Sequence, residues 1–202
     1  MSKKKPVIYP VVFMICLTIF FTLILSILNE VSAERIQEQS QLRVQSRILF
    51  ALNIPFDNQR ESIVQAYNNN VNEISLEGRT IYAGVNNDQI FGYAFRIMGA
   101  GLWGSIESVL AFDKDFEKLL GITFIDHSET PGLGGRIDEI WFQEQFRGLD
   151  LSTPINDRYI IFRPSEGGNV DSISGATSTS NAVLNIFNEN IRLIIEDIKG
   201  GL

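Results

Sequence analysis

The sequence predicts an α+β protein, with a single N-terminal transmembrane helix followed by an antiparallel-sheet domain with flanking helices. Three observations lead to this prediction. Residues 7–28 form an uncharged apolar run, residues 80–125 contain four strand-like runs, and residues 183–198 carry apolar side chains at steps of three and four. With 202 residues, the chain is long enough to bury one sizeable core.

The apolar run VIYPVVFMICLTIFFTLILSIL follows three lysines at positions 3–5. As a helix, its 22 residues would extend roughly 33 Å, enough to cross a hydrocarbon core of about 30 Å. A cleavable signal peptide is the alternative, because Val31-Ser32-Ala33 resembles a cleavage site, but signal-peptide cores run only about 7–15 residues. We therefore expect a retained single-pass anchor in the cell (inner) membrane, with the N-terminus in the cytoplasm.

We expect three parts along the chain. Residues 1–33 hold the cytoplasmic N-terminus and the anchor, residues 34–70 form a juxtamembrane helical segment, and residues 71–202 form an extracytoplasmic domain. Helical periodicity continues from residue 34 to about residue 52, and Pro55 ends it. Asp57 marks the start of a second helix through Tyr67, and the three asparagines at 68–70 are typical of a loop.

Short strands and helices are expected within the domain. The spacing of β-branched and aromatic residues predicts the four strands, and DKDFEK at 113–118 predicts a hairpin connection between the last two. SEGGN at 165–169 is typical of a flexible turn. The remaining predicted elements are strands at 80–85, 90–97, 105–112, 119–125 and 159–163, a short helix at 141–146 and the C-terminal helix.

Composition excludes several classes of function for the part beyond residue 33. That part has 14 basic and 23 acidic residues, a net charge of −9, so we expect it to bind neither nucleic acid nor anionic lipid tightly. It contains no cysteine and a single histidine, His127. Disulfides, thiolate chemistry and multi-histidine metal sites are therefore excluded, and any redox chemistry there would need an organic cofactor.

The segment GAGLWG at 99–104 satisfies the GxGxxG pattern of dinucleotide-binding folds. That fingerprint requires a following helix, whereas a strand-like run follows here, so we reject the dinucleotide interpretation. Two interpretations stay open. The glycines let the backbone kink between strands, or they permit the close approach of a flat ligand with Trp103 packed beside it.

The segment HSETPGLGG at 127–135 predicts a sharply turned loop, because Pro131 is followed by three glycines within four residues. Glu129 and Thr130 would project from the start of this loop. A solvated turn is the simpler interpretation, and a loop shaped around a ligand is the alternative. His127 alone indicates a hydrogen-bonded turn histidine.

The decapeptide DSISGATSTS at 171–180 carries six hydroxyl side chains directly before the C-terminal helix. One hydroxyl is enough to cap a helix, so surplus capping and an anion site are both open interpretations. The N-terminus of a helix is a natural phosphate site because its N–H groups are unpaired. Gly175 and Ala176 leave room for a phosphate, and Thr177, Ser178 and Thr179 would place hydroxyls beside it.

The residues from Asp171 to Thr177 match a flavinylation motif, an Asp three residues ahead of Ser/Thr-Gly-Ala-Thr. With GLWG and ETPGLG upstream and one N-terminal span, the chain resembles the FMN-binding domain family. That domain is shared by the G subunit of Rnf complexes and the C subunit of the Na⁺-translocating NADH:quinone reductase (Nqr). The resemblance covers nearly the whole chain. Its short length favours the Rnf branch, and its Leu-Trp pair favours the Nqr branch.

The resemblance implies a covalent cofactor. The hydroxyl of Thr177 would be joined to the phosphate of FMN by a phosphoester bond, formed by a separate flavin transferase that takes FMN from FAD with magnesium. Further residues of the same segment would serve the transferase and the phosphate: Asp171, Ser174, Gly175, Ala176 and Ser178.

The resemblance also places residues beside the flavin ring. Four positions of ETPGLG are expected next to the isoalloxazine: Glu129, Thr130, Leu133 and Gly134. Trp103 would be an aromatic neighbour. Arg163 is the candidate for a basic residue upstream of SGAT that neutralises the phosphate or tunes the flavin.

The function implied is that of an electron-carrying subunit of a membrane-bound ion-translocating oxidoreductase, not catalytic alone. The whole complex would be an Rnf-type ferredoxin:NAD⁺ oxidoreductase or an Nqr-type NADH:quinone reductase, and its other membrane subunits would be the partners of this chain. Two alternatives stay open: a flavoprotein of another extracytoplasmic electron-transfer or reductase system, and a non-redox membrane-anchored binding module.

Overall fold

The computed structural model describes residues 8–76 and 78–198, and it divides the chain into two compact units. One unit runs up to Gln41 and the other starts at Leu42. Lys3, Lys4 and Lys5, on which the expected cytoplasmic N-terminus depends, lie outside the described residues.

A single helix, α1, spans Ile8–Ala51 and contains residues 8–28 of the apolar run and about half of the juxtamembrane segment, residues 34–51. In the first unit its apolar side chains are exposed, among them Phe13, Phe20 and Phe21. By length and composition this helix is able to cross a membrane, where such side chains would face lipid. The predicted continuation of the helix beyond residue 34 is confirmed, and it ends one residue earlier than expected.

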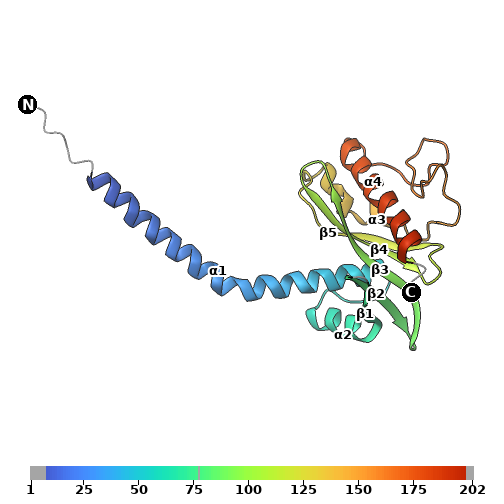
Figure 1. The fold of residues 1–202 in the computed structure, drawn as a ribbon, viewed down its shortest axis with the longest axis horizontal. Helices are drawn as coiled ribbons and strands as arrows, with labels where there is room; N and C mark the ends of the chain where they lie inside the picture. The colour runs from blue at the N-terminus through green and yellow to red at the C-terminus, as the bar shows by residue number, and fades with distance from the viewer. Residues whose placement is uncertain (1–7, 77, 199–202) are drawn as a thin grey trace, which may run out of the picture. The chain divides into compact units, whose positions relative to one another are not determined.

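Five antiparallel strands form the sheet of the second unit, in the order β1-β2-β3-β4-β5 (Figure 1). The four strands predicted between residues 80 and 125 are confirmed as β2 to β5, and DKDFEK lies at the β4–β5 connection as predicted. The strand bounds are β1 Val71–Leu76, β2 Arg79–Asn86, β3 Gln89–Ala100, β4 Ser105–Asp113 and β5 Leu119–Asp126.

The helices of the second unit are short except the last one. The two predicted helices, after Asp57 and around residue 141, are α2 and α3. The C-terminal helix starts earlier in the chain than the apolar pattern indicated, inside the hydroxyl-rich decapeptide. The helix bounds are α2 Arg60–Asn70, the 3₁₀ helix η1 Gly134–Asp138, α3 Ile140–Glu144, α4 Thr177–Leu193 and the π-helical turn η2 Ile194–Ile198.

Both faces of the sheet are covered, so its central strands are buried on two sides. On one face, Leu110 and Phe112 of β4 pack into a core that includes α3 and α4. On the other face, Val109 and Ala111 of the same strand pack with the end of α1 and with α2. Because successive side chains of a strand point to opposite faces, residues 109–112 are all apolar.

Two predictions at the start of the sheet are wrong. The asparagines at 68–70, predicted as a loop, form the last turn of α2, and Val71 donates its N–H to the Tyr67 carbonyl at the helix end. Residues 71–76 (VNEISL) then form β1, which the sequence pattern missed. This edge strand has one buried side chain, that of Val71, so its apolar alternation is weak.

Residues 159–163 (YIIFR) were predicted as a strand, and this prediction is also wrong. The segment takes part only in isolated bridge pairing outside the sheet. The Asn188 side chain on α4 accepts the N–H groups of Tyr159 and Ile160 at 2.7 and 3.0 Å and donates to the Ile160 carbonyl at 2.9 Å. Because a side chain satisfies these backbone groups, the apolar segment packs without joining the sheet.

Antiparallel pairing brings the β3–β4 turn and the loop after β5 to one end of the sheet. The end of β3, the start of β4 and the end of β5 all lie there, as the pairs Ala100–Ser105 and Glu107–Asp126 show. The turn 101–104 therefore lies near the loop that begins at His127. Helix α4 passes close to β3, where Gly99 contacts Ile186.

We expect Gly99→Ala to lower the free energy of unfolding by about 1–3 kcal/mol, because a Cβ atom there would overlap the buried side chain of Ile186. Chemical denaturation of the detergent-solubilised chain measures this loss. In the double variant with Ile186→Ala, the loss should be smaller than the sum of the single losses. Met98→Ala, at an exposed neighbour, is the control, and an equal loss there would contradict the packing argument.

Candidate functional site

A pocket of about 450 Å³ lies where the β3–β4 turn, the loop after β5 and the start of α4 converge. Its volume falls within the range of roughly 300–1,000 Å³ that is typical of small-molecule sites. The three segments are those that carry GLWG, ETPGLG and SGAT. The lining residues are Leu102, Trp103, Thr130, Leu133, Gly134, Gly175, Ala176, Thr177, Ser178 and Thr179.

The apolar part of the lining is exposed. Leu102, Trp103 and Leu133 leave 52%, 69% and 47% of their surface accessible. Large apolar side chains that cluster in the open around a pocket mark a surface for a ligand or a partner. The pocket therefore offers an apolar, partly aromatic wall that suits a flat ligand.

The polar part of the lining is the start of α4. Gly175 adopts a φ of +80°, which turns the chain into the helix, and Ser180 donates the first helical backbone bond, to the Ala176 carbonyl. The amides of the first helical turn, from Thr177 on, therefore have no acceptor within the helix. That turn contains no acidic residue, and its positive end faces a ligand pocket. The arrangement fits a phosphate group.

The surplus hydroxyls of the decapeptide have separate roles in the structure. Within the described residues, no side chain caps the start of α4. Thr179 donates its hydroxyl to Oε2 of Glu129 at 2.6 Å, and the Ser180 hydroxyl accepts the Ile173 N–H at 3.1 Å. Both hydroxyls belong to buried residues, so Thr179 does not offer its hydroxyl to a phosphate as the sequence suggested.

Thr177 and Ser178 are the two exposed residues of the decapeptide whose side chains carry hydroxyls and line the pocket. Ser174 belongs to the same motif but is not a lining residue. Of the six hydroxyls in the decapeptide, the geometry thus leaves two that a bound ligand can reach, and one of them is the threonine of SGAT.

Glu129 lies behind the pocket wall, with 5% of its surface exposed. Its Oε1 accepts the Leu102 N–H at 2.7 Å and the Trp103 N–H at 3.3 Å, while Oε2 accepts the Thr179 hydroxyl. Its own N–H donates to Nδ1 of His127, whose Nε2 lies 3.1 Å from the Asp138 carboxylate. His127 is thus the hydrogen-bonded turn histidine that the sequence predicted.

Two glycines of the motifs are explained by the carboxylate of Glu129. A Cβ atom at Gly101 would lie 2.5 Å from Oε1, and one at Gly134 would lie 2.8 Å from Oε2 and would overlap the Thr179 hydroxyl. Gly101 and Gly104 lie in the turn between β3 and β4, as the kink interpretation expects, while Gly99 belongs to β3. Of the three glycines in the GxGxxG match, Gly101 packs against the Glu129 carboxylate, Gly99 packs against Ile186 and Gly104 packs against Ser128.

Arg163 and Asp171 pair with each other outside the pocket lining. Their Nη1 and Oδ1 atoms are 2.9 Å apart, both side chains are more than half exposed, and Arg163 also donates to the Asn169 carbonyl. The structure therefore brings Arg163 to the motif aspartate, while the phosphate-binding role expected for Arg163 stays a prediction.

Sequence reasoning missed Leu102 and the structural role of Thr179. Leu102 stands beside Trp103 in a glycine-flanked turn, where an exposed apolar pair is itself a signal of a ligand surface. The partner of Thr179 is 50 residues away in sequence, so no local pattern could have identified it.

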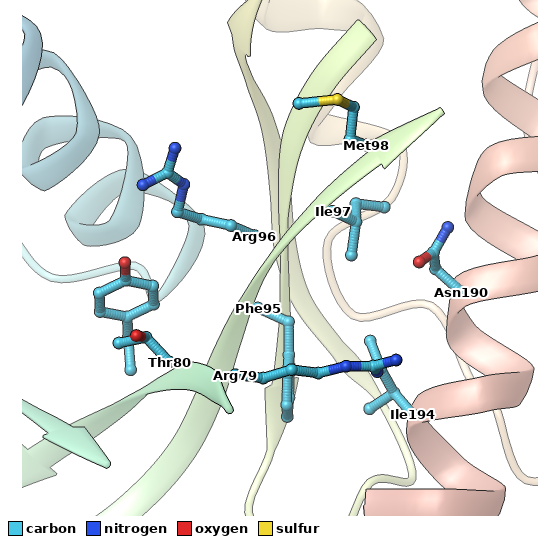
Figure 2. Close-up of a pocket in the computed structure, with 9 residues that line it drawn as sticks. Arg79, Thr80, Phe95, Arg96, Ile97, Met98, Asn190 and Ile194 are labelled. Carbon is cyan, nitrogen blue, oxygen red and sulfur yellow. The ribbon is translucent and has the colours of Figure 1, made fainter. Parts of the chain in front are cut away.

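A second hollow, of about 370 Å³, lies between β2, β3 and the end of α4. Figure 2 shows Arg96 and Thr80 on one side of β3, with Ile97, Asn190 and Ile194 on the other. Arg96 is paired with Glu107. The lining is thus divided by the strand and does not converge on one point. In residues 8–76 and 78–198, no group of three His, Cys, Asp or Glu side chains is placed to hold a metal ion.

The fold and the pocket together define an α+β domain, preceded by one long apolar helix, whose pocket suits a ligand with a flat apolar part and an anionic end. The FMN-binding domain family matches residues 101–192. The chain is 30% identical over 187 residues to the C subunit of the Na⁺-translocating NADH-quinone reductase of Yersinia pestis, covering 77% of this chain and 67% of the relative. The chain belongs to the FMN-binding domain family.

Other relatives include the G subunit of the ion-translocating oxidoreductase complex of Methanosarcina acetivorans, at 34% identity over 59% of this chain and 62% of the relative. The matched part of the chain spans 67% of the Yersinia pestis subunit, 62% of the Methanosarcina acetivorans subunit and 42% of the C subunit of the Pasteurella multocida reductase.

Solved structures show the same fold. The C subunit of the Na⁺-translocating NADH-quinone reductase from Parabacteroides distasonis superposes with a TM-score of 0.65 at 21% identity, over 80% of this chain and 94% of that one. NqrC of Shewanella oneidensis gives a TM-score of 0.64 at 16% identity, over 75% and 93%. The predicted α+β class with an antiparallel sheet is confirmed.

We expect Gly134→Ala to destabilise the site by about 1–3 kcal/mol, because its Cβ atom would displace the Thr179 hydroxyl from Glu129 and leave a buried acceptor unpaired. Thermal denaturation of the full chain in detergent measures the loss. Ser178→Ala, at an exposed position in the same helical turn, should change stability by less than about 0.5 kcal/mol. Equal melting temperatures for the two variants would contradict the contact.

Proposed function

We propose that the chain is the electron-carrying flavoprotein subunit of an Rnf- or Nqr-type ion-translocating oxidoreductase, with FMN esterified to Thr177. One observation carries this proposal. The threonine of SGAT is the first residue of α4 and lines the pocket. The apolar part of the same lining is exposed and suits an isoalloxazine ring. Family membership and the names of the relatives support the same assignment.

The residues fit FMN part by part. Gly175 and Ala176 bring the backbone close to the pocket, and the free amides of the first turn of α4 suit the phosphate. Leu102, Trp103 and Leu133 would hold the ring through apolar contact. Thr130 and Gly134, which also line the pocket, would lie beside the ring.

The attachment step that we infer is a phosphoryl transfer to a threonine hydroxyl. In it, a flavin transferase breaks the pyrophosphate bond of FAD, AMP leaves, and the FMN phosphorus forms an ester with Oγ1 of Thr177, whose proton is lost. The structure supports Thr177 as the acceptor because the hydroxyls of Thr179 and Ser180 are already engaged in buried hydrogen bonds. Asp171 and Ser174, outside the pocket, are left to contact the transferase.

When bound, the flavin supplies the redox chemistry, and the protein supplies placement and electrostatics. The exposed apolar wall leaves the ring accessible for electron exchange with neighbouring subunits. An ester bond has a physical advantage for a domain outside the cytoplasm, because a cofactor that dissociates there is lost by dilution. The chain would therefore relay electrons and would not bind a small-molecule substrate.

We place this domain on the extracytoplasmic side of the cell membrane, attached through α1. The lysines ahead of the apolar run support a cytoplasmic N-terminus. The expected partners are the membrane subunits of the complex and the flavin transferase. The net charge of −9 beyond residue 33 argues against nucleic acid as a partner.

Intact-protein mass and in-gel fluorescence of the denatured chain test the attachment site. The chain co-expressed with a flavin transferase should gain the mass of one FMN less one water, and Thr177→Ala should abolish both the gain and the fluorescence. Thr177→Ser keeps the hydroxyl and should retain part of the flavin. Thr153→Ala, at an exposed threonine outside the pocket, is the matched control. Denaturation-resistant flavin on Thr177→Ala would contradict the assignment.

A further inference from the structure

We propose that Glu129 and Thr179 are positioning residues that fix the walls of the flavin pocket through the hydrogen bonds of the Glu129 carboxylate, which itself lies outside the pocket lining. The inference rests on the proposed function and assigns these two residues a role different from ligand contact. We call the group the Glu129 clamp: the Glu129 carboxylate and its three donors, which are the Leu102 N–H, the Trp103 N–H and the Thr179 hydroxyl.

The Glu129 clamp ties together segments that are distant in sequence. Oε1 holds the β3–β4 turn at Leu102 and Trp103, 26–27 residues away, and Oε2 holds the first turn of α4 at Thr179, 50 residues away. Glu129 itself belongs to the loop after β5, beside the lining residue Thr130. All three segments that form the pocket therefore meet at one side chain.

Burial makes these hydrogen bonds effective. Glu129 and Thr179 expose 5% and 2% of their surface, so water does not compete for the donors. Bonds to a carboxylate are stronger than bonds between neutral groups, and the surroundings of low polarity strengthen them further. A carboxylate beside the first turn of α4 also interacts favourably with the helix dipole.

Two glycines leave just enough room for the Glu129 carboxylate. A Cβ atom at Gly101 would lie 2.5 Å from Oε1, and one at Gly134 would lie 2.8 Å from Oε2. Below, the Glu129 N–H is held by His127, which in turn contacts Asp138. The acid is thus confined on both sides, and a shift of any one segment would break a hydrogen bond.

The exposure of Trp103 explains why the pocket depends on the Glu129 clamp. Its side chain is 69% exposed, so packing does not hold the indole in place. Its backbone N–H, together with that of Leu102, is bound by Glu129. The position of the aromatic wall relative to Thr177 is therefore set by the backbone of the turn and by the clamp.

The Glu129 clamp also contributes to the choice of acceptor. Thr179 lies two residues from Thr177 and lines the same pocket, yet its hydroxyl is committed to Glu129. Breaking that bond would release a second threonine hydroxyl near the phosphate site. The clamp therefore both shapes the pocket and removes a competing nucleophile.

The test compares Thr179→Val, which keeps the shape but removes the donor, with Thr179→Ser, which keeps the donor. Glu129→Ala removes all three bonds, and Thr153→Val is the control at an exposed site. The first readout is amide hydrogen exchange at Leu102 and Trp103 in the flavin-free full chain. We expect exchange about tenfold faster in Thr179→Val and in Glu129→Ala, and wild-type exchange in Thr179→Ser and in the control.

The second readout is flavin attachment and flavin emission after incubation with FAD and a transferase. We expect attachment of flavin to Thr179→Val to be slower by about tenfold. We also expect the fluorescence of the attached flavin to be stronger, because the Trp103 indole is no longer held at a fixed distance from the flavin ring. Thr179→Ser should restore both properties. Melting temperatures separate these effects from general unfolding, and Thr179→Val serves if Glu129→Ala does not fold.

Wild-type exchange at both amides in Thr179→Val and Glu129→Ala would overturn the clamp. Altered exchange with unchanged attachment and emission would overturn its role in positioning the flavin wall. Wild-type chain that never acquires flavin would instead refute the proposed function, while the exchange data from flavin-free chain would still decide whether the Glu129 clamp orders the turn.

Discussion

The buried carboxylate of Glu129 is the interaction on which the pocket depends. It accepts two backbone N–H groups from the β3–β4 turn and a hydroxyl from the first turn of α4, and so links the loop after β5 to both of these segments. An acid with 5% exposure has to be satisfied in this way, because an unpaired buried acceptor is costly. Glycines at positions 101 and 134 follow from the same requirement, since any side chain there would occupy the space of the carboxylate or of its partner.

The sheet provides the frame for this interaction. An antiparallel order from β1 to β5 brings the ends of β3 and β5 and the start of β4 together, so the segments GLWG and ETPGLG become neighbours although 26 residues separate their glutamate and tryptophan. Helix α4 completes the site because its apolar stripe packs on the sheet, with Gly99 against Ile186. Burial of the sheet face that packs against α4 thus fixes the start of this helix. The free amides and the hydroxyl of Thr177 are thereby held near an apolar wall that stays exposed.

Sequence patterns predicted the elements whose signal is local. The apolar helix, strands β2 to β5 and the C-terminal helix carry strong periodicity, and the motifs identified the three segments of the pocket. Strand β1 was missed because an edge strand with a single buried side chain has little alternation, and YIIFR was mistaken for a strand because its backbone partner is the Asn188 side chain, 28–29 residues further on. Local patterns also could not predict the separate roles of the hydroxyls. Thr179 and Ser180 have the side chains of helix caps, yet Thr179 bonds to Glu129 and Ser180 accepts the Ile173 N–H.

In the function that we propose, α1 would anchor the domain to the membrane. The pocket would present the Thr177 hydroxyl at the start of α4, and the exposed apolar wall would leave a flavin ring open to redox partners. Fragmentation mass spectrometry of the proteolytic peptide that contains Thr177, taken from native chain matured with a flavin transferase, tests this account most directly. The account predicts one FMN on that peptide with the phosphoryl group on the threonine oxygen. An unmodified peptide from chain that has had access to the transferase and FAD, or flavin localised to Ser174 or Ser178, would contradict it.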